Sequence, residues 1–211
     1  MPDYTLRNVK GSELTFSELD NNFVASRTTA RLNCNAVVTP SSGVYVNQSL
    51  KGGAMDTETS VTNQIVLTPF VLAYDLTIDQ VGVFQTSTGT TDLRILIYSS
   101  NASGQPDSKL YESTTITTAN GENTQAATHT FTANVLYWVG THTSGGKTFR
   151  SVPPTGLLPL GIGTGLNTTA ISHAVVLGST AIGSAPATWS FATSQLGSST
   201  NGVISVGFRA S

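Results

Sequence analysis

Hydrophobic and polar residues alternate through much of the chain from Ile65 onward, with the period of two that is typical of β-strands. Leu76–Val81 and Val203–Phe208 alternate, whereas Ile95–Tyr98 and Leu136–Val139 are continuous apolar runs that indicate strands buried on both faces. Turn-forming segments rich in Gly, Asn, Ser and Pro separate these stretches. The predicted strands are Ile65–Leu72, Leu76–Gln85, Leu93–Tyr98, Leu110–Thr117, His129–Thr132, Leu136–His142, Thr148–Val152, His173–Leu177, Thr188–Phe191 and Val203–Arg209.

This pattern predicts a mostly β fold, a β-sandwich or jelly roll, for residues 65–211. No helical period of useful length lies between the strands, and no internal repeat of 20–50 residues is visible.

The first 25 residues have a different pattern, which predicts a short helix over Phe16–Ala25. Thr15 can cap its N-terminus while Glu18, three residues later, reaches back to the Thr15 N–H. Phe16, Leu19 and Phe23 then form one apolar stripe. A helix this short is marginal alone in water, so the stripe is expected to bury against its own domain or against a neighbouring subunit.

Residues 26–64 carry weak signals and are rich in Thr, Asn, Ser and Gly. Val37-Val38 and Val44-Tyr45-Val46 could form two short strands joined by the turn Pro40–Gly43. We therefore expect an extended neck here, between an N-terminal segment at 1–25 and a head at 65–211.

The composition and charge of the chain argue against several classes of function. Only 10% of the 211 residues are charged, compared with about 25% in ordinary soluble domains, and the net charge is −2. Nucleic-acid binding is not expected, because no basic stripe is present to neutralise phosphates. The single cysteine, Cys34, has no internal partner, and no apolar run is long enough to insert into a membrane. The N-terminus has no signal-peptide pattern, although the composition is typical of extracellular or virion proteins. A protein that leaves its cell as part of a larger particle would combine both features.

The sequence contains no strong catalytic or metal-binding motif. His129 and His142 could lie on neighbouring strands, but together with His173 they lack the spacing of a metal site. Gly145-Gly146-Lys147-Thr148 misses the phosphate-loop spacing by one residue and precedes a predicted strand, so we interpret it as a hairpin turn. No nucleophile elbow occurs, and a carboxylate pair for sugar cleavage cannot be identified from sequence. We expect no enzyme activity, cofactor or metal. Trp138 is expected to be a core residue, and Trp189 a loop residue exposed to solvent.

The segment Gly11–Phe23 resembles one that is common near the N-terminus of tail-fibre and other virion proteins of tailed bacteriophages, with the pattern G-x-x-L-T-[YF]-x-E-[LM]-D-x-N-F. The residues that match it are Leu14, Thr15, Phe16, Glu18, Leu19, Asp20, Asn22 and Phe23. The order of strands from Pro69 to Val139 is also similar to phage jelly-roll heads.

The resemblance implies a homotrimeric virion subunit that docks on other virion proteins through these N-terminal residues. A short tail fibre or baseplate-attached protein is the first hypothesis, with a β head that contacts the host surface, where a glycan is a candidate partner. A capsid decoration or head-fibre protein is the alternative, and a polysaccharide-degrading or free sugar-binding protein ranks lower. The residues predicted for receptor contact are Asn101, Gln105 and Trp189.

Overall fold

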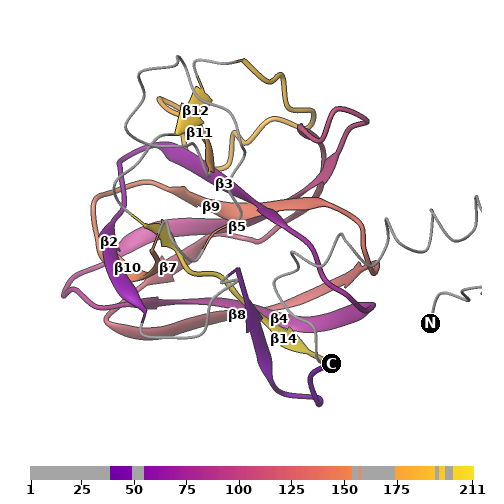
Figure 1. Ribbon diagram of the computed structural model, residues 1–211. Coiled ribbons are helices and arrows are strands. Elements are labelled where there is room, and N and C mark those ends of the chain that lie inside the picture. The colour runs from indigo at the N-terminus through magenta and orange to yellow at the C-terminus, as the bar shows by residue number, and fades with distance from the viewer. Residues whose placement is uncertain (1–38, 49–54, 154–156, 158–173, 193–194, 198–201) are drawn as a thin grey trace, which may run out of the picture.

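The computed structural model describes residues 39–48, 55–153, 157, 174–192, 195–197 and 202–211. This part of the chain is mostly β, with two antiparallel sheets packed face to face as a sandwich (Figure 1). None of the described segments forms a helix of the length and apolarity that crossing a membrane requires.

One sheet is built around β4 and is called here the β4 sheet. Its strands follow the order β1-β14-β4-β10-β13, with β2 also paired to β10 and β8 also paired to β4. The bounds are β1 Tyr45–Asn47, β2 Asp56–Thr59, β4 Leu76–Gln85, β8 Gly121–Phe131, β10 Thr148–Val152, β13 Val203–Ile204 and β14 Gly207–Ala210.

The other sheet has β9 at its centre and is called the β9 sheet. Its order is β12-β11-β3-β9-β5-β6, with β7 also paired to β5. The bounds are β3 Gln64–Phe70, β5 Thr91–Ser100, β6 Pro106–Glu112, β7 Ile116–Thr118, β9 Tyr137–Thr143, β11 Ala174–Leu177 and β12 Leu196–Gly197.

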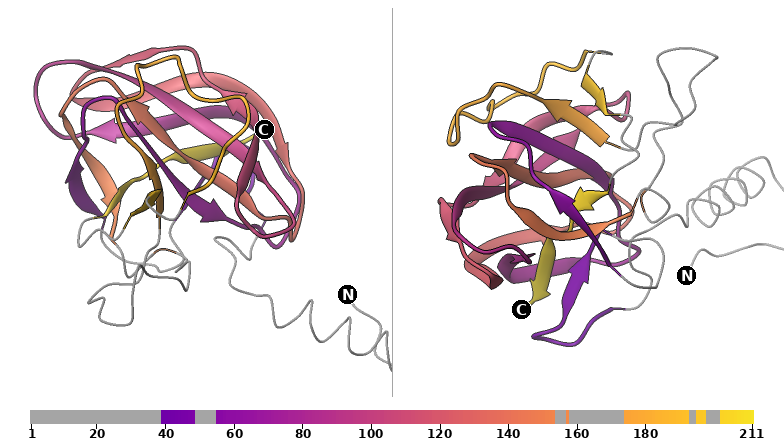
Figure 2. Two further views of the ribbon diagram at one scale, coloured as in Figure 1. Left: turned by 90° about the horizontal axis from the view of Figure 1, so that it is seen from above. Right: turned by 90° about the vertical axis from the view of Figure 1, so that its left-hand side faces the viewer.

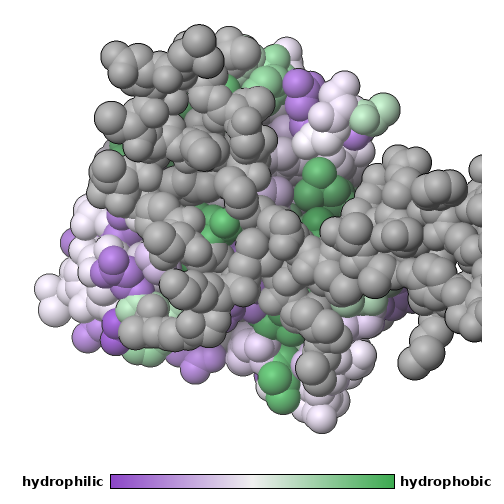
Figure 3. All heavy atoms as spheres, in the orientation of Figure 1, coloured by the Kyte–Doolittle hydropathy of each residue, from purple (hydrophilic) through white to green (hydrophobic). Residues whose placement is uncertain are grey.

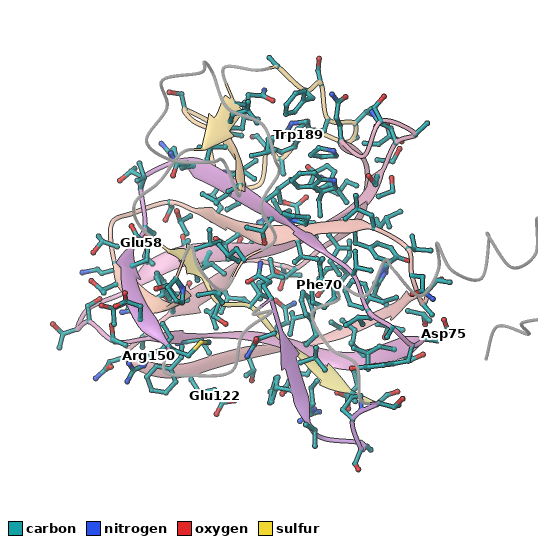
Figure 4. The ribbon with its side chains drawn as sticks, in the orientation of Figure 1. Glu58, Phe70, Asp75, Glu122, Arg150 and Trp189 are labelled. Atoms are coloured by element: carbon teal, nitrogen blue, oxygen red, sulfur yellow. The ribbon has the colours of Figure 1, made fainter. Side chains whose placement is uncertain are left out.

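The main core lies between the two sheets. Phe70 of the β9 sheet packs against Phe131 and Phe208 of the β4 sheet, with ring centroids 5.1 and 5.2 Å apart. Phe131 and Phe208 are themselves 5.1 Å apart, and all three side chains are fully buried. Figure 4 shows Phe70 in the middle layer of the molecule. Edge and tilted contacts of this kind add to the hydrophobic stabilisation that burial supplies.

A second core covers the outer face of the β9 sheet. Leu96, Tyr98 and Trp138 point away from the main core and pack under the segment 178–192, which carries Trp189. The Tyr98 hydroxyl donates a 2.6 Å hydrogen bond to the Pro186 carbonyl, which fastens this cover to the sheet. The apolar run Ile95–Tyr98 therefore belongs to a strand that is buried on both faces, as the sequence predicted. The two further views of Figure 2 show the cover on the β9 side of the sandwich.

The strand predictions were confirmed where alternation and turns agree. β4 and β10 have the predicted bounds, and β3, β5, β9 and β11 differ from them by only a few residues. The predicted strand Val203–Arg209 is split into β13 and β14 around Ser205-Val206, where the Ser205 N–H donates to the Arg150 carbonyl at 2.9 Å.

Other predictions were wrong. Leu110–Thr117 divides into β6 and β7, because Ser113 pairs with Ile95 through both its N–H and its hydroxyl and breaks the ladder. β8 begins at Gly121 rather than at His129, so residues 121–128 form a strand where the sequence predicted a turn-forming connection. Thr188–Phe191 forms only an isolated bridge, between Thr188 and Ser108. The Gly145–Thr148 segment joins strands of opposite sheets and is not a hairpin turn.

Part of the segment expected to be a neck contributes strands to the sandwich. β1 pairs with β14 and β2 pairs with β10, and Val46 belongs to the main core. The strand predicted at Val44–Val46 is present as β1, one residue further along. The predicted helix and Val37-Val38 lie outside the described residues.

Candidate functional site

The eight predicted attachment residues, from Leu14 to Phe23, lie outside the described residues, so their role stays a prediction. The three predicted receptor-contact residues are all described, and the structure separates them into two environments.

Asn101 and Gln105 lie together in the loop between β5 and β6. The Asn101 carboxamide oxygen accepts the N–H groups of Ser103 and Gln105 at 2.9 and 3.0 Å, which is the geometry of an Asx turn. Beside this loop is a hollow of ≈ 430 Å³ whose lining includes Asn101, Asn134 and Leu136. The Asn101 side chain therefore stabilises the conformation of its own loop, and it is also exposed beside the hollow.

Trp189 is buried, with 5% of its surface exposed, so the expectation of a solvent-exposed side chain was wrong. Its indole N–H donates to Gln195 at 3.1 Å, and its ring packs edge-on against Tyr98 with centroids 5.5 Å apart. Trp189 anchors the cover over the β9 sheet, which leaves no large face of its ring for a partner. Trp138 is a core residue, as predicted.

His129 and His142 lie on different sheets, so the suggested pairing of their strands was wrong. β8, which carries His129, pairs with β4, while β9, which carries His142, pairs with β3 and β5. Burial lowers the pKa of His129, whose ring packs against Phe131 at a centroid distance of 4.7 Å. Within the described ranges, no three His, Cys, Asp or Glu side chains come together as a metal site would require.

The outer face of the β4 sheet carries a groove that the sequence alone did not reveal. The register places Thr124, Gly82, Gly207 and Asn47 in one row across β8, β4, β14 and β1. Gly82 and Gly207, at the centre of the row, carry no side chain, so the Thr124 methyl group lies against Gly82 and the Tyr45 ring lies against Gly207. Larger side chains of the rows on either side form the walls. The resulting hollow has a volume of ≈ 570 Å³. We call it the Gly82–Gly207 groove.

Tyr45 forms one wall and is held in place by its surroundings. A Cβ atom on Gly207 would lie only 2.9 Å from Tyr45 Cδ1, so the absence of a side chain there lets the ring lie close against β14. The Tyr45 hydroxyl donates a hydrogen bond to the side-chain oxygen of Gln80 on β4. Burial of the hydroxyl, together with the negative charge of Glu122, raises the pKa of Tyr45. The ring remains 38% exposed and faces the groove.

The other wall combines an exposed aromatic ring with two charges, and the Glu122 carboxylate in it lies close enough to the Tyr45 hydroxyl to hydrogen-bond with it. Phe84 pairs across the strands with Glu122 and is 44% exposed. Arg150 lies on the neighbouring strand β10, and Figure 4 shows Glu122 and Arg150 on the side of the molecule opposite Trp189. Within the described residues neither of them is part of an ion pair, whereas Arg209 is bound in two places by Asp79, at 2.7 and 3.0 Å.

A smaller hollow of ≈ 250 Å³ opens between β2, β3, β11 and β13. Its lining is largely apolar, and among the described residues that line it Glu58 is the only ionisable one. Burial and the neighbouring Asp56 carboxylate raise the pKa of Glu58, while the Gly202 N–H, which donates to it, acts in the opposite direction.

The groove escaped sequence reasoning because its residues come from five strands spread between Tyr45 and Gly207. The one local signal was Phe84, an aromatic residue at an outward position of a clearly alternating strand. Figure 3 shows several small, separate groups of hydrophobic residues on this face, one of them at the lower end of the molecule.

No family model matches the chain, and no curated protein matches it significantly.

Proposed function

We propose that this chain is a structural and adhesion subunit of a tailed-bacteriophage virion, docked on the particle by its N-terminal segment and exposing its β-sandwich to the host surface. The observation that carries the proposal is the order along the chain. The motif from Leu14 to Phe23 comes first, and the segments that form the sandwich and its core follow it. The proposed role is binding and assembly, without catalysis or a cofactor.

The finer parts of the proposal concern the fold and the assembly. We propose that the sandwich is a jelly roll, which is supported by the way the chain passes from one sheet to the other at most of its connections, as from β3 to β4 to β5 and from β8 to β9 to β10. We also propose that three copies assemble, because repeated copies of a modest anchor would together bind firmly. Burial of each Leu or Phe of the motif is worth about 1.5–3 kcal/mol.

Deleting residues 1–23 tests the anchor. Particles are purified from host cells that supply either the full chain or the truncated chain, and the subunit is detected in them by mass spectrometry. We expect the truncated chain to be folded but absent from particles. The double variant Phe16→Ala, Phe23→Ala should also lose incorporation. Ser12→Ala, which lies outside the apolar stripe, is the matched control and should be incorporated normally. Normal incorporation of the truncated chain would overturn the proposal.

Two measurements complete the test. Light scattering should give the mass of three 22.0 kDa chains, and a stable monomer would contradict the trimer. Imaging of labelled particles locates the subunit, where a position on the tail supports a fibre or baseplate protein and a position on the head supports capsid decoration instead.

A further inference from the structure

We infer that the Gly82–Gly207 groove binds a chain of neutral pyranose sugars. The inference rests on the proposed adhesive function and deepens it, because it gives the contact a location and a ligand class. It also moves the contact away from Asn101, Gln105 and Trp189, the residues that the sequence suggested.

The two sheets have different outer faces. The outer face of the β9 sheet is closed by the segment 178–192, which is fastened by Tyr98, by Trp189 and by Lys109, whose ammonium donates to the Ala185 carbonyl at 2.9 Å. The outer face of the β4 sheet instead keeps Tyr45 and Phe84 exposed. Single exposed apolar side chains are common, but Tyr45 and Phe84 line the same hollow, and exposed apolar side chains that gather in one place mark binding surfaces.

The dimensions of the groove suit a short, elongated ligand. Along the strand direction, the two walls contain Gln80 and Phe84 of β4. These residues are four positions apart, so their Cα atoms are separated by about 14 Å. Across the strands, the row from Thr124 on β8 to Asn47 on β1 spans three strand spacings, also about 14 Å, and the Tyr45 ring lies over the Gly207 part of it. The volume of ≈ 570 Å³ lies within the range of small-molecule sites.

The chemistry of the walls favours a sugar. The C–H face of a pyranose ring is apolar and packs on an aromatic face, which Tyr45 and Phe84 supply. Hydroxyl groups both donate and accept, so they match the Glu122 carboxylate as acceptor and the Arg150 guanidinium as donor. One negative and one positive side chain give no net preference for a charged ligand.

The groove is also prepared before binding. The Tyr45 ring is set by close packing on Gly207 and by its hydrogen bond to Gln80, so little conformational freedom remains for it to lose. The strands of Gly82 and Gly207, β4 and β14, already have ladder partners on both sides, so a peptide cannot insert between them as an extra strand.

The test uses the full chain and a glycan array that carries neutral oligosaccharides, such as maltohexaose, chitohexaose and O-chains of bacterial lipopolysaccharides, next to acidic ones. We expect binding to one or more neutral glycans, measured again in solution by calorimetry. Tyr45→Ala and Phe84→Ala should each weaken it by about tenfold or more. Glu122→Gln should weaken it less, and it keeps the shape of the side chain if an alanine variant fails to fold.

Val61→Ala and Leu110→Ala are the matched controls, because these side chains are 55% and 46% exposed and lie outside the groove; they should bind like the wild type. The inference is overturned if the wild type binds no neutral glycan, if it binds only acidic ones, or if Tyr45→Ala and Phe84→Ala bind normally. It is also overturned if these two variants change the mass in light scattering, since the face would then be a contact between copies of the chain. Incorporation into particles is measured separately. Normal incorporation without glycan binding would reject only the binding role of the groove. Glycan binding without incorporation would reject only the role in the virion.

Discussion

Gln48 and Val206 are 158 positions apart in the sequence, and the side-chain oxygen of Gln48 accepts the Val206 N–H at 3.0 Å in the buried core. The amide nitrogen of the same side chain donates to Thr68 Oγ1 at 3.1 Å and to the Val139 carbonyl at 3.2 Å. Thr68 and Val139 belong to the β9 sheet, whereas Val206 directly precedes β14 of the β4 sheet. One carboxamide therefore joins the two sheets.

Replacing this carboxamide should be costly. Gln48→Ala leaves the Val206 N–H and the Val139 carbonyl buried without this partner, which costs about 1–3 kcal/mol in the free energy of unfolding. Urea unfolding followed by circular dichroism measures the loss. Thr128→Ala, at an exposed position of β8, is the control and should stay within about 0.5 kcal/mol. Equal stability of the two variants would show that Gln48 does not join the sheets energetically.

The aromatic core predicts a contrast between two phenylalanines. Phe131→Ala removes a fully buried ring that contacts both Phe70 and Phe208, and we expect a loss of about 3–5 kcal/mol. Phe84→Ala should cost much less, since nearly half of its side chain is already in water. Thermal unfolding of both variants checks this order, and an equal loss would contradict the assignment of Phe84 to an open surface.

Gly140 is expected to tolerate no side chain. A Cβ atom at this position of β9 would overlap the Val66 carbonyl oxygen on β3, a clash with backbone that only a displacement of the strand could relieve. Gly140→Ala should therefore abolish folding or lower the unfolding midpoint strongly. Gly178→Ala, which meets nothing within 4 Å, should leave the midpoint unchanged or slightly raised. Soluble, folded Gly140→Ala with the wild-type midpoint would refute the close approach of β3 and β9.

His129 should make stability dependent on pH. Burial lowers its pKa in the folded state below the value of about 6.5 expected in the unfolded chain. Between these two pKa values, only the unfolded state binds the proton, which favours unfolding. The stability that depends on neutral His129 is therefore fully present above about pH 6.5 and is lost as the pH falls through the pKa of the folded state. Urea midpoints of the wild type should therefore fall from about pH 8 to about pH 5, and His129→Leu should fall less.

Thr128→Ala, next to His129, is the control for that slope and should keep it. If the wild type and His129→Leu lose stability in parallel, other groups are responsible for the pH dependence.

The sequence predicted the fold best where two signals agreed. β4 combines alternation with turn residues at both ends, and its predicted bounds were confirmed. β8 was mostly missed because its first half, Gly121–Gln125, is polar at every position, and such residues are also typical of turns. Only pairing along β4 makes this segment a strand.

The candidate site was harder to predict for a related reason. Trp189 has the sequence context of a loop, and the loop folds back as a cover, so local polarity said nothing about its burial. Gly82 and Gly207 gain their meaning only when β4 and β14 pair in the observed register. A site made by strand register is invisible to any motif that is read along the chain.

The pairing of β1 with β14 also determines when the sandwich can be completed. β14 lies between β1 and β4, so Tyr45–Asn47 has no hydrogen-bonding neighbour in the sheet until Gly207–Ala210 is in place. During synthesis, β1 leaves the ribosome long before its partner, because the strands β2 to β13 all emerge between them. A nascent chain stalled before Gly207 would carry an open edge along β4 and a loose first strand, which makes it a natural substrate for chaperones and proteases.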